Sequence, residues 1–320
     1  MKFGRLFLAC AVSMLMSASA AWSQTAYPNQ IVKIVVPFSA GSNTDILARI
    51  LSEKLGPLWG QTVIVENKPG ISGTISVANS PADGYTLMLT SNGHTILSAL
   101  NKDLSIDPIT GFAGVAEVAS VPLVLIVAPE VPATNLKEFI ALAKAKPGTL
   151  NFASAGLASS NYIAGELLKQ TAAIDIVHIP YRGTPEQLTS LMRGDAQLSM
   201  AFLGTALSFI QAGKVRALAI ATPQRSPSMP DVPTFAEAGL PDYKYDSWFG
   251  LMAPAKTPAP ILKKISDDVA KVMKEPEVAK RLETLGAVPV GNTPAQFDAI
   301  IRADADRYGK LLRAAGITPK

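Results

Sequence analysis

The chain has almost none of the residue types that build metal centres and covalent catalytic centres. Its 320 residues include one cysteine, Cys10, and two histidines, His94 and His178. Cys10 lies inside an apolar run at the start of the chain, not at its end, where a lipid-anchored protein carries its cysteine. Removal of that run would leave no thiol, and hence no disulfide, cysteine metal site or cysteine nucleophile. Two histidines are little material for a zinc site or a proton relay, so we expect no metal and no cofactor.

Long hydrophobic runs are also lacking. The longest feature of this kind spans residues 6–16, follows Lys2 and Arg5, and precedes small residues at positions 18–20. This order is typical of a signal peptide, and the run is too short to cross a membrane. The alternative is a buried N-terminal helix. We favour export, with a signal peptide over residues 1–20 and cleavage between residues 20 and 24.

Strong charge of one sign is missing too. The formal net charge is +4, and loss of Lys2 and Arg5 with the signal peptide would lower it by two. The basic residues are scattered, without the basic and aromatic stripe that nucleic-acid binding needs, so we expect no nucleic-acid partner. The roughly 300 residues that remain suffice for two domains.

Strand and helix patterns alternate along the chain after the predicted signal peptide. Residues 31–36 are rich in β-branched residues and predict a buried strand. Residues 45–55 have apolar side chains at helical spacing, with Thr44 as the expected cap and Gly56 as the expected stop. Further strands are expected over residues 62–66, 85–89, 121–128, 151–153, 176–179, 197–202 and 215–221. Further helices are expected over residues 136–144, 159–170, 184–192 (with a capping box at 184–187), 261–274, 276–285 and 294–315. The alternation predicts an α/β fold with mostly parallel sheets covered by helices on both faces.

The motifs of common enzymes do not occur. The chain has no G-x-S-x-G elbow, no phosphate-binding G-x-x-x-x-G-K-[ST] loop and no H-E-x-x-H. Acidic residues are plentiful, so acid–base chemistry by paired carboxylates stays open as an alternative.

Three loops along the chain are rich in small residues. They cover residues 37–44, 90–95 and 154–160, and the first and third open expected helices. Glycine and serine let a backbone approach a ligand, and a helix N-terminus offers unpaired N–H groups with a partial positive charge. Such loops are also common in α/β folds that bind nothing there. Two facing helix N-termini could nevertheless hold a carboxylate without any arginine.

Several ordered motifs resemble one family. They are PFSAGSNTDILAR from Pro37, VENKPGISGTI from Val65, ADGYTLML from Ala82, FASAGLASSNYIAGELL from Phe152, HIPYRGTPEQLTSLMRGDAQLSM from His178 and SWFGLMAPAKTP from Ser247. From Tyr27 to the C-terminus the chain is similar to the substrate-binding proteins of tripartite tricarboxylate transporters, the Bug family of periplasmic receptors.

The resemblance implies a type II periplasmic-binding-protein fold, with two α/β lobes joined by crossing strands and a ligand cleft between them. It places the crossings near residues 121–128 and 248–254. Lobe one would comprise residues 24–123 and 247–320, and lobe two residues 124–246.

The resemblance also implies a set of ligand-binding residues. Carried over by position, they are Phe38, Ser39, Gly41, Ser42, Asp45, Ser91, Asn92, His94, Ser154, Gly156, Ala158, Ser159 and Tyr162. We favour Asp45 as an organiser of its loop, because it stands in the first turn of the expected helix.

Several positions depart from the family pattern toward larger or more apolar side chains. Ser42 and Ala158 stand where the family usually has glycine, and Tyr162 where it usually has histidine. Phe202 and Leu203 follow a strand after which relatives often carry a polar group. If Phe202 faces the cleft, the ligand should carry an aromatic or extended apolar body behind its carboxylate; the alternative is that these side chains fill the core of lobe two. Arg182 could reach a second carboxylate or could be a solvated surface residue.

The function implied is that of a periplasmic solute-binding receptor, not an enzyme. It would capture a small organic carboxylate, close around it and be presented to the membrane permease subunits of the transporter; we expect a monomer. The alternatives are an exported α/β hydrolytic enzyme and a ligand-sensing module that docks on a sensor kinase.

We predict that the protein isolated from the periplasm begins between residues 21 and 25. The positive start, the short apolar run and the small residues at 18–20 provide the signal for cleavage. N-terminal sequencing checks this, and an intact Met1 on the purified periplasmic protein would contradict it.

Overall fold

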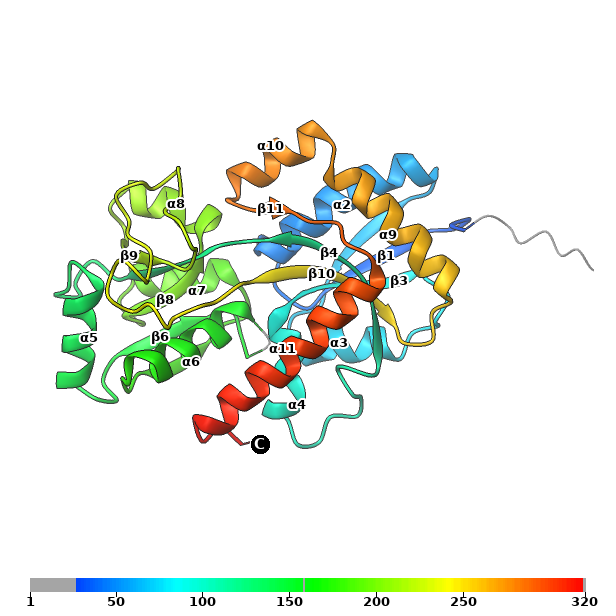
Figure 1. Cartoon of the computed structure of the whole chain (residues 1–320). Helices are drawn as coiled ribbons and strands as arrows, with labels where there is room; N and C mark the ends of the chain where they lie inside the picture. The colour runs from blue at the N-terminus through cyan, green and yellow to red at the C-terminus, as the bar shows by residue number, and fades with distance from the viewer. Residues whose placement is uncertain (1–26, 158, 319–320) are drawn as a thin grey trace, which may run out of the picture.

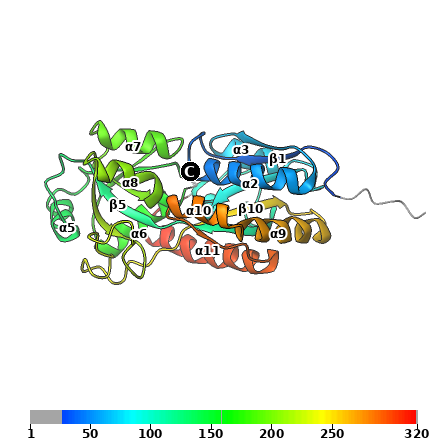
Figure 2. The ribbon, with the colours of Figure 1, turned by 90° about the horizontal axis from the view of Figure 1, so that it is seen from above.

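The computed structural model describes residues 27–157 and 159–318, which form two α/β lobes side by side (Figure 1). Seen from above, the two lobes form an elongated molecule, with α5 at one end and α9 at the other (Figure 2). The predicted signal peptide and cleavage site lie outside the described residues.

The first lobe is built on a six-stranded sheet. Its strands are, in spatial order, β11 (Val288–Pro289), β4 (Phe112–Ser120), β10 (Trp248–Pro254), β3 (Thr86–Ser91), β1 (Val32–Val36) and β2 (Val63–Asn67). Strand β1 is parallel to β2 and β3, whereas β10 is antiparallel to both β3 and β4. The helices of this lobe are α2 (Asn43–Trp59), α3 (Ile71–Ala78), the 3₁₀ helix η1 (Asn92–Ile96), α4 (Leu97–Leu100), α9 (Ala259–Met273), α10 (Pro276–Thr284) and α11 (Pro294–Ala314). Strands that are distant in the sequence thus share one sheet.

The second lobe is built on a five-stranded sheet. Its strands are, in spatial order, β7 (Val177–Pro180), β6 (Asn151–Ser154), β8 (Leu198–Phe202), β5 (Leu123–Val127) and β9 (Arg216–Ile220). Its helices are α5 (Leu136–Ala145), α6 (Ser160–Ala172), α7 (Thr184–Met192) and α8 (Leu203–Gln211). The chain enters this lobe between β4 and β5 and leaves it between β9 and β10, so two segments connect the lobes. None of the helices in the described part of the chain is long and apolar enough to span a membrane.

Helix α2 differs from the prediction at both ends. Its cap is Ser42, whose Oγ accepts a hydrogen bond from the Asp45 N–H at 3.2 Å, so Thr44 lies inside the helix. Gly56 does not stop it, because the apolar stripe continues to Trp59. The Trp59 indole donates to the buried carboxylate of Asp268 at 2.7 Å, which ties the last turn to α9.

One other local prediction is wrong, and one strand was missed. The expected capping box at residues 184–187 is not formed: α7 begins at Thr184 itself, and the Glu186 carboxylate accepts from the Arg182 N–H instead. Strand β4 was not predicted, because its alanines and glycine weaken the usual strand signal. A capping box does occur at Thr293, at the start of α11.

Helix α11 packs against the first sheet at Gly250 of β10. A Cβ atom at Gly250 would lie 1.9 Å from Cζ of the buried Phe297, a separation that side chains do not tolerate. The sheet and the helix can therefore pack this closely only with glycine at that position.

We predict that Gly250→Ala lowers the free energy of unfolding by about 1–3 kcal/mol, because an extra methyl group overpacks the core. Gly309→Ala, inside α11, is the control: its Cβ would meet only the flexible end of Arg313 at 3.4 Å. It should be neutral or stabilising by up to about 1 kcal/mol. Chemical denaturation of both variants tests this, and equal stabilities would contradict it.

Candidate functional site

A narrow cavity of about 10 Å³, with room for about one water molecule, lies between the two lobes. The first lobe contributes Phe38, Ser42, Asn43, Thr44, Ser91 and Phe249, and the second contributes Ala155, Ser159, Ser160, Asn161, Thr184 and Phe202.

Three helices begin at the cavity wall. Helix α2 contributes Asn43 and Thr44, α6 contributes Ser160 and Asn161, and α7 contributes Thr184, all from their first turns. A helix N-terminus carries unpaired N–H groups and about half a unit of positive charge. Their convergence favours an anionic group in the cavity.

The first loop is fixed by the carboxylate of Asp45. This carboxylate accepts hydrogen bonds from the Gly41 N–H at 2.9 Å, from Asn67 Nδ2 at 3.0 Å and from Arg49 Nε at 3.0 Å. Burial alone would raise the pKa of Asp45, but these hydrogen bonds outweigh it and the pKa is lowered. Asp45 does not line the cavity. It is ionised and neutralised behind the loop, which is the arrangement expected of a loop organiser.

Polar atoms in this region are buried without a partner among the described residues. They include both side-chain heteroatoms of Asn43 and the side-chain oxygens of Asn161 and Ser39. Asn43 is 1% exposed and lines the cavity, so its amide offers one donor and one acceptor there. An unsatisfied buried polar group costs about 1–3 kcal/mol. The amide of Asn43 is therefore poised to bind a polar group of a ligand.

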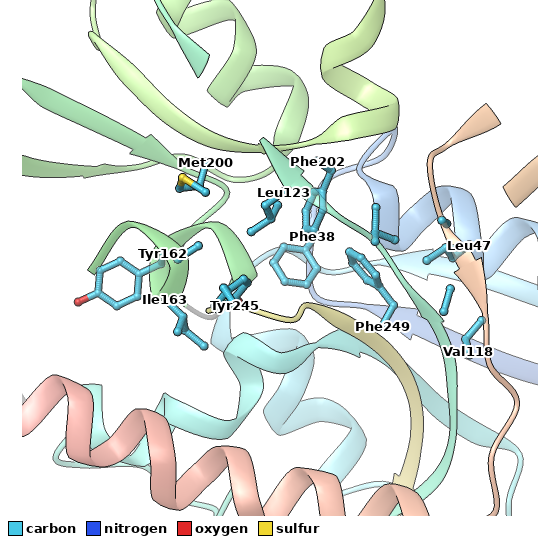
Figure 3. Packing of buried hydrophobic residues seen from close by; sticks show 14 of the residues in the cluster. Phe38, Leu47, Val118, Leu123, Tyr162, Ile163, Met200, Phe202, Tyr245 and Phe249 are labelled. Carbon is cyan, nitrogen blue, oxygen red and sulfur yellow. The ribbon is translucent and has the colours of Figure 1, made fainter. Parts of the chain in front are cut away.

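One wall of the cavity is aromatic. The rings of Phe202 and Phe249 are 5.0 Å apart, and Phe38 lies beside them (Figure 3). Leu203, unlike Phe202 before it, does not line the cavity and packs in the core of the second lobe. The cavity therefore combines a polar end at the helix N-termini with an apolar wall.

Two residues expected at the site have side chains elsewhere. His94 is fully buried, and its Nε2 lies 2.7 Å from the carbonyl oxygen of Pro108. Burial lowers the pKa of His94 to about 4, so the ring is neutral. The ring of Tyr162 packs against Phe152 and His178. Figure 3 shows its hydroxyl pointing away from Phe38, Phe202 and Phe249. Tyr162 lies on the face of α6 that packs on its own sheet, so the position implied by the resemblance does not bring its ring to the cavity.

Other expected residues support the loops or the junction of the lobes. Ser154 Oγ accepts from the Gly156 N–H at 3.1 Å and lies 2.7 Å from His178 Nε2, so it shapes its own loop. The Ser39 N–H donates to the carbonyl of Arg182 in the other lobe at 3.2 Å. Ala158 lies outside the described residues.

Asn92 connects the lobes through its side chain. Its Nδ2 donates to the hydroxyl of Tyr245 at 2.9 Å and to the carbonyl of Asp246 at 3.1 Å, and its Oδ1 accepts from the Ser160 hydroxyl. Tyr245 also lies 2.9 Å from the carbonyl oxygen of Ser160. We call these three side chains, Asn92, Ser160 and Tyr245, the inter-lobe junction. The amide of Asn92 is fully engaged there and is not offered to the cavity.

The sequence analysis missed several cavity residues. They are Asn43, Thr44, Ala155, Ser160, Asn161, Thr184 and Phe249. Most occupy the first turn of a helix, directly after a capping serine or a small-residue loop. That position is a usable signal, because first-turn residues surround the same unpaired N–H groups. Within the described residues, no cluster of three or more His, Cys, Asp and Glu side chains could hold a metal.

Known proteins share both the sequence and this architecture. The family model described as the tripartite tricarboxylate transporter family receptor matches residues 47–317. The periplasmic binding protein BugD has 31% identity and a TM-score of 0.85, over 92% of this chain and 100% of that one. Rpa4515 of R. palustris, solved with adipate, has 33% identity and a TM-score of 0.86 over 92% and 100%.

A third structure extends the same likeness. MatC of Rhodopseudomonas palustris, solved with bound malate, has 32% identity and a TM-score of 0.84 over 89% of this chain and 100% of that one. These are binding proteins rather than enzymes, and their two-lobe fold is the one described above. The chain belongs to the tripartite tricarboxylate transporter receptor family, the TctC or Bug family of periplasmic solute-binding proteins.

Proposed function

We propose that this protein captures a small organic carboxylate in the inter-lobe cavity and presents it, enclosed, to the permease subunits of a tripartite transporter. The observation that carries the proposal is the buried amide of Asn43, which has no hydrogen-bond partner among the described residues and lies where three helices begin. Helix N-termini favour an anion, and an amide can donate to one of its oxygens. Relatives solved with adipate and with malate support a carboxylate as that anion.

The site residues we assign are those that surround this point. Asn43 would receive the carboxylate through its amide, Thr44 and Thr184 through hydroxyl and backbone N–H groups, and Ser159 and Ser160 through their backbone N–H groups, because the two serine hydroxyls donate to the Gly156 carbonyl and to Asn92. Asp45 would act through Gly41 by holding the first loop in place.

The phenylalanine wall indicates the rest of the ligand. Phe38, Phe202 and Phe249 give apolar surfaces to the cavity that the helix N-termini also line. An aromatic or aliphatic body would be buried against them, at about 25 cal/mol per Å² of apolar surface removed from water. A tricarboxylate such as citrate would leave its hydroxyl and its further carboxylate groups without partners along this wall.

Closure of the lobes would complete the site. The cavity is lined from both lobes and is small, so a ligand enters only when the lobes separate. The hydrogen bonds of Asn92 to Tyr245 and Ser160 join the two lobes and would be exchanged for water in an open form. Hinge motion of this kind is usual in periplasmic binding proteins. We propose the same for residues 24–123 and 247–320 moving against residues 124–246, in a periplasmic protein exported with its signal peptide removed.

We predict that Asn43→Asp weakens carboxylate binding at least 100-fold, because a second negative charge of the same shape then faces the ligand. The best ligand of the wild type is first chosen by thermal shift from benzoate, hexanoate, adipate, malate and citrate; bound ligand at 100 times its dissociation constant should add about 2.7 kcal/mol of stability. Calorimetry then measures its affinity for the variant.

The matched control for that experiment is Asn135→Asp. Asn135 caps α5 on the exposed surface of the second lobe, where aspartate caps equally well. This control should bind like the wild type. Native affinity in Asn43→Asp, or no stabilisation of the wild type by any carboxylate, would contradict the proposed function.

We predict that Tyr245→Phe weakens the same ligand about tenfold. The change removes the Tyr245 partner of the buried Asn92 amide, a contact between the lobes, at a cost of about 1–3 kcal/mol to the closed form. The hydrogen bond of Tyr245 to the Ser160 carbonyl lies within the second lobe, so its loss affects the open and closed forms alike. Tyr243→Phe is the control, because the Tyr243 hydroxyl donates to the Ala164 carbonyl within the second lobe. Equal affinities of the two variants would remove the inter-lobe junction from the mechanism of closure.

A further inference from the structure

A second cavity lies beside the segment that leads from the second lobe back to the first. It has a volume of about 260 Å³, and among the described residues none lines both this cavity and the one between the lobes. We call it the hinge pocket. Its walls are the end of β9, the loop that follows β9, and the connecting segment between residues 241 and 246. Its volume is close to the lower end of the roughly 300–1,000 Å³ that is usual for small-molecule sites.

The inner wall of the hinge pocket is aromatic and rigid. Phe235 and Tyr243 line it with rings that are stacked, their centroids 4.0 Å apart and their planes at 25°. Both rings are buried, and the Tyr243 hydroxyl donates to the carbonyl of Ala164 at 3.0 Å. Ile220 and Pro223 add aliphatic surface. Such a wall suits the apolar part of a small molecule.

Two opposite charges line the same pocket, those of Lys244 and Asp246. Tyr243, Tyr245 and Ser247 are buried, whereas Lys244 and Asp246 between them are exposed, as in an extended segment whose side chains alternate between two sides. Neither Lys244 nor Asp246 forms an ion pair with another described residue. The hinge pocket therefore offers one cation and one anion beside an apolar wall.

The wall of the hinge pocket is also the segment that holds the first lobe. The Tyr245 hydroxyl and the Asp246 carbonyl accept hydrogen bonds from Asn92 Nδ2 of the first lobe, at 2.9 and 3.1 Å. The Lys244 carbonyl accepts from Arg307 of α11 at 2.7 Å. A molecule that fills the pocket in this arrangement therefore stabilises the arrangement in which these contacts between the lobes are made.

We propose that the hinge pocket is an effector site for a small zwitterion with an apolar side chain, such as an aliphatic or aromatic α-amino acid, and that its occupation favours closure of the lobes. The ammonium group meets Asp246, the carboxylate meets Lys244, and the side chain packs on Phe235 and Tyr243. A simple carboxylate would be repelled by Asp246. This separates the hinge pocket from the inter-lobe cavity, whose described walls include no acidic residue.

The site is tested by calorimetry with leucine and with phenylalanine, without any other acid. Leucine is compared with 4-methylpentanoate, which lacks the ammonium group, with 3-methylbutylamine, which lacks the carboxylate, and with glycine, which lacks the side chain. The proteins are the wild type, Lys244→Gln and Lys214→Gln. Lys214 is a matched control, because it is an exposed lysine of the second lobe that does not line the hinge pocket.

We expect the wild type and Lys214→Gln to bind at least one of the two amino acids. Leucine should bind at least tenfold more tightly than each of its three analogues, and Lys244→Gln should weaken amino-acid binding at least fivefold. Binding of neither amino acid, or equal binding by Lys244→Gln and Lys214→Gln, would overturn the effector site while leaving the carboxylate receptor intact.

The effect on closure rests on the proposed function and has its own measurement. The affinity for the best acid is measured with and without a saturating concentration of the bound amino acid. It should rise about threefold to tenfold in the wild type and in Lys214→Gln, and change less than twofold in Lys244→Gln at the same concentration. An unchanged or weakened affinity in the wild type would overturn the coupling, because competition for the inter-lobe cavity gives weakening. Failure of every acid to bind would overturn the proposed function, whereas the effector site is judged by the loss of amino-acid binding in Lys244→Gln.

Discussion

The convergence of three helix N-termini in one enclosed space is the constraint around which the site is organised. Their N–H groups repel cations and favour anions, so no acidic side chain can face the cavity without cancelling them. Asp45 stands in the first turn of α2, yet its carboxylate is turned behind the loop and held by Arg49, Asn67 and the Gly41 N–H. The positive potential at the cavity is thereby kept for a ligand.

The lobes meet through two kinds of contact. Phe202 and Phe249 join them through an apolar contact between rings, whereas Asn92 joins them through hydrogen bonds to Tyr245 and Ser160. If the lobes part as we propose, water can replace these hydrogen bonds at modest cost.

Much of the fold could be predicted from the sequence, because its strands and helices carry clear periodic patterns and most have turn residues at their ends. Strand β4 escaped because alanine and glycine give little strand signal, and α2 ran past Gly56 because a tertiary contact of Trp59 extends it. The site was predicted at the level of loops but not of side chains. Asn92 and Tyr162 lie on the expected segments, yet rotation about the helix or 3₁₀ axis turns one to the junction and the other to its own sheet.

The seam between the lobes is tight where Gly183 faces Ser39. A Cβ atom at Gly183 would lie 2.1 Å from Ser39 Oγ and 3.3 Å from Ser39 Cβ and N, so a side chain at position 183 would require Ser39 to rotate or shift. The lack of a side chain there lets the two loops approach one another beside the hydrogen bond from the Ser39 N–H to the Arg182 carbonyl.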